Sequence, residues 1–266
     1  MTDSSHISIR DVHKVFQSGN QEVHALKAID LEVSRGEFVC LLGPSGCGKS
    51  TLLNAVAGFS LPSSGTITVD QSLITEPGPD RGMVFQEYAL FPWMTVEQNI
   101  AFGLQIKRTA KPAIQEKVDG LLELLNLQDF RKRYPKDLSG GMRQRVAIAR
   151  VLAIDSPIML MDEPFGALDA LTRRNLQDEL LRLWTELKKT ILFVTHSIEE
   201  ALYLADRTVV MTYRPGTIKR DLIIDLPRPR DVASTAFNAL KKELSQLLME
   251  EQSRHNQDEL KGAAVD

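Results

Sequence analysis

Three observations predict the fold class of this chain, which is α/β with a mixed core sheet. Short apolar runs typical of buried strands alternate with helical patterns over most of the 266 residues, and such alternation builds a parallel sheet covered by helices. The segment from about 95 to 155 is helical almost throughout, which predicts a helical subdomain inserted into the sheet domain. Residues 7–36 contain only short strand-like runs and turns, which predicts an N-terminal antiparallel β subdomain.

The elements follow in order. The N-terminal strands are separated by turns near residues 17–20 and 34–36. The run Phe38–Leu42 is apolar throughout, as expected for a strand buried on both faces, and a helix is expected at 51–57. Later strands are expected at 158–161, 191–194, 209–211 and 218–224, and helices at 171–188 and 198–205.

The C-terminal part of the chain differs in composition from the rest. An amphipathic helix is expected at about 233–250, after the proline-rich segment Pro227–Arg230. The following residues, 251–266, are polar and are expected to be frayed. We therefore predict a domain of residues 1–230 and a C-terminal helix with a polar tail at 231–266.

Composition excludes several classes of protein. The net charge of −3 gives no general attraction to nucleic acid or anionic lipid. No apolar run approaches the roughly 18 residues of a spanning helix, and the first residues do not resemble a secretory signal. We expect a chain in the cytosol that reaches a membrane only through partner proteins. The two cysteines predict neither a disulfide framework nor a metal site. Cys40 is expected in the core, whereas Cys47 is either buried or reactive.

A glycine-rich segment between an expected strand and an expected helix carries the main functional signal. It fits the pattern G-x-x-x-x-G-K-[ST], whose glycines let backbone N–H groups converge on phosphate oxygens. Lys49 is expected to reach the β- and γ-phosphates, and Ser50 to ligate Mg²⁺. The predicted nucleotide-binding residues here are Gly43, Pro44, Ser45, Gly46, Cys47, Gly48, Lys49, Ser50 and Thr51.

A pair of carboxylates follows a second apolar strand about a hundred residues later. Asp162 ends the run Ile158–Asp162 and Glu163 comes next. Alone, such a pair is usually a solvated loop. Together with a phosphate loop, it predicts that Asp162 lies beside the metal and that Glu163 takes a proton from attacking water.

The segment Leu138–Arg145, Leu-Ser-Gly-Gly-Met-Arg-Gln-Arg, resembles the signature motif of ATP-binding-cassette (ABC) ATPases. The resemblance extends over residues 7–225 and implies the ABC form of the P-loop NTPase fold. Further motifs match in the family's order: Gln86 resembles the Q-loop residue, Asp169 the D-loop residue, and His196 the switch histidine. Phe16 stands where the family stacks an aromatic ring, usually tyrosine, on adenine.

The resemblance implies a role for each of these residues. Two cassettes would sandwich ATP, with Ser139 and Gly141 of one copy capping the γ-phosphate held by the other. Gln86 would touch the metal and the attacking water, and His196 would sense the γ-phosphate. Asp169 would cross the interface. The chain carries one copy of each motif, so it would need a second ABC subunit, expected to be identical, to complete a site with ATP and Mg²⁺.

Residues Pro79–Trp93 and the segment Tyr213–Gly216 resemble the nitrate/sulfonate/taurine branch of bacterial importers. That branch implies a peripheral subunit at the cytoplasmic face of the inner membrane. The subunit would dock on a transmembrane permease near Gln86–Met94 and serve an extracytoplasmic solute-binding protein indirectly. The apolar side chains of 88–94 form either this docking groove or core packing under the helical subdomain.

Two other functions stay open. A soluble ABC ATPase in cytosolic assembly would have a partner outside the membrane, and a nucleotide-dependent regulatory module would bind without turnover. Intact Glu163 and His196 disfavour the second. The absence of an N-K-x-D motif disfavours a GTPase.

Overall fold

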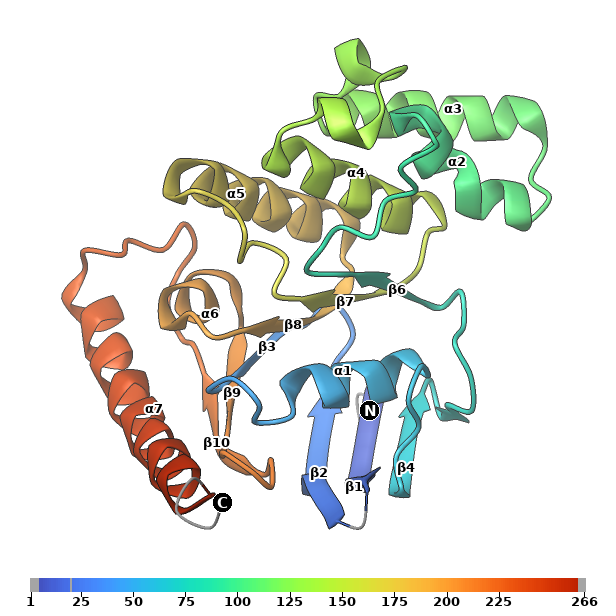
Figure 1. Ribbon diagram of the computed structural model, residues 1–266. Helices are drawn as coiled ribbons and strands as arrows, with labels where there is room; N and C mark the ends of the chain where they lie inside the picture. The colour runs from blue at the N-terminus through green and yellow to red at the C-terminus, as the bar shows by residue number, and fades with distance from the viewer. Residues whose placement is uncertain (1–4, 20, 263–266) are drawn as a thin grey trace. The chain divides into compact units, whose positions relative to one another are not determined.

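The computed structural model describes residues 5–19 and 21–262 (Figure 1). The chain forms two compact units. We call the first, made of residues up to Pro77 and from Thr190 onward, the sheet unit. The second, Gly78–Lys189, is the helical unit.

The sheet unit contains the expected antiparallel subdomain. Strands β1 (Ile7–Ser18) and β2 (Gln21–Val33) form a hairpin, and β1 also pairs antiparallel with β4 (Ser64–Val69), which pairs with β5 (Ser72–Leu73). Residues Ile7, Ile9 and Ile29 are fully buried. The last two strands were not predicted, because their serine- and threonine-rich sequence lacks a continuous apolar run.

The second sheet of this unit is built around β3 (Phe38–Leu42). It pairs in parallel with β8 (Thr190–Thr195) and β9 (Arg207–Met211), while β10 (Ile218–Ile223) runs antiparallel to β9. All five residues of β3 are buried, which agrees with their uninterrupted apolar sequence. The mixed sheet is confirmed. Among its described residues the unit also contains the helices α1 (Lys49–Ala57), α6 (Ile198–Leu204) and α7 (Thr235–Gly262).

The helical unit contains the predicted helical insertion. Two parallel strands, β6 (Arg81–Val84) and β7 (Ile158–Asp162), accompany α2 (Val96–Ile106), α3 (Lys111–Leu124), α4 (Gly140–Ala153) and α5 (Ala170–Leu187). Two single 3₁₀ turns lie at Gln128–Phe130 and Pro135–Asp137. Thr95 and Gln98 form a capping box at the start of α2, and Pro112 stands in the first turn of α3, where its missing N–H has no cost.

The expectation of a frayed tail from residue 251 is wrong for most of that segment. Helix α7 continues to Gly262, twelve residues beyond the expected end at 250. The physical reason at the start of this segment is that Glu251 is fully buried and forms an ion pair with Lys219. Residues 263–266 lie outside the described residues. No helix in the described part of the chain is long and apolar enough to cross a membrane.

Candidate functional site

Residues 43–51 include the glycine-rich loop after β3 and the first turn of α1, and we call them the phosphate loop. Gly46 and Gly48 have φ angles of 75° and 96°, which side chains adopt only with strain. A Cβ atom on Gly48 would lie 2.7 Å from Leu26 Cδ2 and 2.9 Å from the Ala25 oxygen. No described side chain caps α1. Its first N–H groups and its dipole therefore favour an anion here.

The ammonium group of Lys49 lies inside this loop. Lys49 is only 4% exposed, and Nζ donates hydrogen bonds to the carbonyl oxygens of Gly43 at 2.8 Å and Pro44 at 2.9 Å. A buried cation needs several acceptors, and anionic oxygens are stronger partners for it than neutral carbonyls. Phosphate oxygens that enter the loop would meet a cation already positioned there.

Cys47 is fully buried in the same loop, with its Sγ atom 3.7 Å from Lys49 Nζ. Burial raises the pKa of the thiol, and the Lys49 ammonium opposes this only in part. The thiolate is the reactive form of cysteine, so the structure favours a packed residue over a reactive one. Cys40 on β3 is also buried, and burial raises its pKa well above the usual value.

The remaining expected nucleotide residues of the sheet unit are accessible. Ser45 and Ser50 are exposed, and Thr51 is half-buried in the first turn of α1. Phe16 on β1 is 42% exposed, with Lys14 Nζ 5.1 Å from the centroid of its ring. The Phe16 ring is therefore available for stacking on a flat partner.

Two predicted catalytic side chains lie close together in the helical unit. Glu163 follows the last residue of β7, Asp162, with φ at 43°, a conformation that is uncommon outside glycine and concentrates at functional sites. A Cβ atom on Gly166 would lie 3.9 Å from Glu163 Oε2 and 3.8 Å from Gln86 Nε2. The carboxylate and the amide thus converge on the same point of the unit.

Ser139 is the N-cap of α4, where its hydroxyl oxygen accepts a hydrogen bond from the Met142 N–H at 3.3 Å. The Ser139 side chain is exposed. A Cβ atom on Gly141 would lie 2.6 Å from Thr172 Cγ2, so the glycine lets the starts of α4 and α5 approach each other. The signature segment is therefore a helix start on the surface of its unit.

The other two motif residues also stand at helix starts. Asp169 is the exposed N-cap of α5 and accepts a hydrogen bond from the Thr172 N–H at 3.0 Å. This bond from the Thr172 backbone holds the pKa of Asp169 below its usual value. His196 follows β8 directly and is exposed, and Ser197 after it caps α6.

The expected site residues divide between the two units. Phe16, His196 and the residues of the phosphate loop belong to the sheet unit. The helical unit carries the other expected residues: Gln86, Ser139, Gly141, Asp162, Glu163 and Asp169.

The segment after Gln86 is partly packed and partly exposed. Phe91 packs on Phe102 with ring centroids 4.5 Å apart, whereas Trp93 is 69% exposed. The sequence left open whether these aromatic side chains form a docking groove or fill the core. The exposure of Trp93 shows that they do not all fill the core.

Sequence reasoning missed two residues that hold this segment in shape. Asn99 is fully buried and its amide bonds the backbone N–H and carbonyl of Phe91. Arg150 Nη1 donates to the Ala89 carbonyl oxygen at 2.7 Å. The sequence did contain a signal for both residues, because an amide or guanidinium group on the apolar face of a helix needs a hydrogen-bond partner nearby.

Comparison with known proteins identifies the class. Residues 26–166 match the family described as ABC transporter. The chain is similar to the nitrate import ATP-binding protein NrtD of Synechocystis, at 47% identity over 90% of each chain. It is also similar to the aliphatic sulfonates import ATP-binding protein SsuB of Bacillus licheniformis, at 48% identity over 90% of this chain and 92% of that protein.

A solved structure agrees with these sequence relatives. It is the dimeric, post-hydrolysis state of an ATP-binding cassette bound to ADP and Pi, with a TM-score of 0.74 and 32% identity over 83% of this chain and all of that one. The chain belongs to the ABC transporter family. Within that family it is an ATPase, and it binds ATP.

Proposed function

We propose that the phosphate loop holds the phosphates of ATP. Lys49 exchanges its loop carbonyls for oxygens of the β- and γ-phosphates, while backbone N–H groups of residues 45–51 bind the remaining phosphate oxygens. Phe16 stacks on the adenine. The burial of Lys49 and the positive φ angles of its neighbours support this assignment. In this proposal residues 1–230 are the ATPase domain, to which 231–266 are an addition.

The expected metal ligands are chemically suited to Mg²⁺. Ser50 offers a hydroxyl, Asp162 a carboxylate and Gln86 an amide oxygen, which are the hard oxygen donors that this cation prefers. Mg²⁺ bound by these residues would neutralise charge that develops on the phosphates.

Hydrolysis in this proposal depends on Glu163. Its carboxylate accepts a proton from the attacking water, and Gln86 beside it orients that water. The left-handed backbone at Glu163 directs its side chain toward the Gly166 region. His196 contacts the γ-phosphate and keeps this geometry.

A second copy of the chain completes the site. Ser139 and Gly141 stand at an exposed helix start, which is suited to contact a phosphate held by another molecule. Asp169 lies at a second exposed helix start and crosses the interface. The dimeric cassette with which this chain shares its fold supports the pairing.

The chain in turn powers an importer for a small solute, an anion such as nitrate, a sulfonate or taurine. It sits at the cytoplasmic face of the membrane, contacts permease subunits through Gln86–Met94, and serves a solute-binding protein indirectly. The observation that carries this step is the exposure of Trp93, seven residues after Gln86, whose amide lies near Gly166 as the Glu163 carboxylate does. A partner helix on this surface would link solute transport to nucleotide hydrolysis.

The substitution Glu163→Gln tests the catalytic assignment. We expect ATP turnover to fall by about 100-fold or more, since a general base contributes on the order of 10²–10⁴, while ATP binding persists and the chain becomes dimeric with ATP. Turnover and mass by light scattering measure both. Glu116→Gln, an exposed carboxylate on α3, is the control. Unchanged turnover in Glu163→Gln would show that the base lies elsewhere.

The substitution Trp93→Glu tests the membrane partner. In cells that express the chain naturally, we expect the variant to leave the membrane fraction, with unchanged ATP turnover of the purified chain. Met249→Glu, which alters an equally exposed apolar residue on α7, should stay with the membranes. If wild type and both variants sediment alike, docking does not use this surface.

A further inference from the structure

The loop between β9 and β10, residues 212–217, packs directly against the phosphate loop. A Cβ atom on Gly216 would lie 2.2 Å from the Cys47 carbonyl oxygen, so only glycine fits there. Arg214 Nε donates a hydrogen bond to the Gly46 carbonyl oxygen at 3.2 Å. A Cβ atom on Gly46 would lie 3.6 Å from Arg214 Nη2. The 212–217 loop therefore contacts the phosphate loop at Gly46 and Cys47.

The bond from Arg214 acts on a peptide group that the phosphate loop needs. The Gly46 oxygen and the Cys47 N–H belong to one planar trans peptide and point in opposite directions. Holding the oxygen with a guanidinium therefore fixes the direction of that N–H. In this structure the Cys47 N–H donates a long hydrogen bond, 3.4 Å, to the Pro44 carbonyl oxygen of the same loop, which an anion that enters the loop would replace. The positive charge also polarises the peptide, which makes its N–H a stronger donor to an anion.

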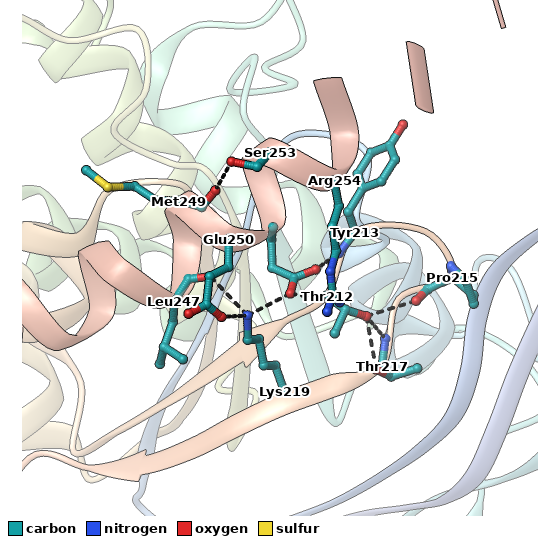
Figure 2. Close-up of polar contacts among 11 residues, drawn as sticks. Thr212, Tyr213, Pro215, Thr217, Lys219, Leu247, Met249, Glu250, Ser253 and Arg254 are labelled. Atoms are coloured by element: carbon teal, nitrogen blue, oxygen red, sulfur yellow. Dashed lines mark hydrogen bonds and ion pairs between the residues drawn. The ribbon is translucent and has the colours of Figure 1, made fainter. Parts of the chain in front are cut away.

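The 212–217 loop has its own internal hydrogen bonds. Thr212 Oγ1 donates to the Pro215 carbonyl oxygen at 2.9 Å and lies 2.9 Å from Thr217 Oγ1 (Figure 2). Beside it is a cleft of about 600 Å³, lined by Lys27 of β2, Arg254 of α7 and the loop itself. Gly216 is tied to β2 by two backbone bonds of 2.9 Å, from the Lys27 N–H to its oxygen and from its N–H to the Ala25 oxygen. Residues 213–215 line the cleft instead, so their position depends on other anchors.

Helix α7 supplies an anchor for residue 213. Glu251 is fully buried, and its Oε2 atom accepts a hydrogen bond from the Tyr213 N–H at 2.9 Å. Its Oε1 atom accepts bonds from Lys219 Nζ at 2.8 Å and Arg254 Nη1 at 3.2 Å. His255 stacks on the Tyr213 ring with centroids 4.3 Å apart.

The charge of Glu251 is maintained in spite of its burial. Burial raises the pKa of this carboxyl, but the bonds from Lys219 and from the Tyr213 backbone outweigh it and hold the pKa below its usual value. Glu251 therefore binds, as an anion, the backbone of the residue that precedes Arg214. A continuous set of contacts runs from the C-terminal helix to the phosphate loop, all within the sheet unit.

We propose that Arg214 is a positioning residue for nucleotide binding and that Glu251 of α7 holds it in place. The proposal rests on the assignment of residues 43–51 as the phosphate-binding loop. The sequence motifs of the ATPase predict no role for α7. In this proposal, α7 stabilises the conformation of the phosphate loop that binds nucleotide.

The first test is the nucleotide affinity of Arg214→Gln. We expect the Kd for a fluorescent ATP analogue with Mg²⁺ to rise about 5-fold to 10-fold, the effect of roughly 1 kcal/mol, with the KM for ATP rising alike and kcat nearly unchanged. Thermal unfolding of the nucleotide-free variant should match wild type, because Arg214 is exposed. Arg214→Lys, which keeps a donor, should recover part of the affinity. A Kd within 2-fold of wild type would overturn the role of Arg214.

The second test separates Glu251 from its neighbour Glu250. Both carboxylates bind Lys219 Nζ, at 2.8 and 2.6 Å, but only Glu251 also binds the Tyr213 backbone. We expect Glu251→Gln to weaken nucleotide binding and Glu250→Gln to leave it unchanged. The double variant Glu251→Gln/Arg214→Gln should bind no more weakly than Arg214→Gln alone. Multiplied effects would show that Glu251 does not act through Arg214. If Glu251→Gln does not fold, the Arg214 variants still decide that residue's role, and Glu251→Asp, a shorter carboxylate, replaces it in the cycle.

Lys49→Ala distinguishes failure of this proposal from failure of the site itself. If Lys49→Ala binds nucleotide as wild type does, the assignment of the phosphate loop is wrong. If Lys49→Ala loses binding while Arg214→Gln retains it, only the positioning role fails.

Discussion

Two helices of this chain begin in glycine-rich sequence, and the two starts are built differently. Helix α1 begins after Gly48 in a left-handed conformation, without a capping side chain among the described residues. Helix α4 begins after Ser139, whose hydroxyl already binds the Met142 N–H. Both present a positive helix end. Only the first surrounds a buried cation, Lys49.

The difference indicates which start binds the nucleotide by itself and which needs a partner. The phosphate loop supplies N–H groups, a positive φ turn and an ammonium within nine residues, so it can hold phosphates alone. The signature segment is exposed and capped by its own serine, which suits a surface that contacts a phosphate presented by another copy. Substitutions in the two helix starts should therefore affect different properties.

The largest expected effect is that of Lys49→Ala. Loss of the ammonium should weaken ATP binding about 100-fold, since a charged hydrogen-bonding group in a buried site contributes roughly 3 kcal/mol. Isothermal titration with ATP and Mg²⁺ measures this. Lys242→Ala, an exposed lysine on α7, is the charge-matched control and should bind as wild type does. Equal affinities in the two variants would remove the distinction between the two helix starts.

The sequence predicted these two helix starts with unequal detail. The pattern of Gly43–Ser50 predicted both the loop and the position of Lys49, because this arrangement of glycines, lysine and serine between a strand and a helix is specific to a phosphate-binding loop. For Ser139, the family resemblance implied contact with a γ-phosphate but not that the serine caps helix α4. Strand β6 was missed because Arg81–Val84 is short and mixed, and its pairing with β7 is set by tertiary contacts.

The sequence could not predict the contacts made by α7, because these contacts also join residues that are distant in the sequence. A buried glutamate in the polar segment after residue 250 looks like a solvated residue until its partners are known. Lys219 lies more than thirty residues earlier, on β10. Local polarity therefore predicted fraying, whereas long-range pairing produced an ordered helix.

An effect on stability is expected next, from Gly48→Ala. The left-handed φ costs a side chain about 1–2 kcal/mol, and the contacts with Leu26 and the Ala25 oxygen add to it. We expect the free energy of unfolding to fall by about 2–4 kcal/mol in urea titration. Gly120→Ala is the matched control, because it lies within α3 with no atom within 4 Å of the added Cβ. That variant should be about 0.5–1 kcal/mol more stable than wild type. Similar losses in both would mean that the backbone at Gly48 is not constrained.

The smallest expected effect is that of Ser139→Ala, and it separates capping from pairing. Loss of the N-cap should lower the free energy of unfolding by about 1 kcal/mol, while the affinity of the single chain for ATP stays unchanged. Thr95→Ala removes the cap of α2 in the same unit and should cost about as much stability. Only Ser139→Ala should also reduce ATP-dependent dimer formation in the Glu163→Gln background, measured by light scattering. If both variants dimerise as fully as their parent, Ser139 is a helix cap alone, and the two glycine-rich helix starts do not share one bound nucleotide.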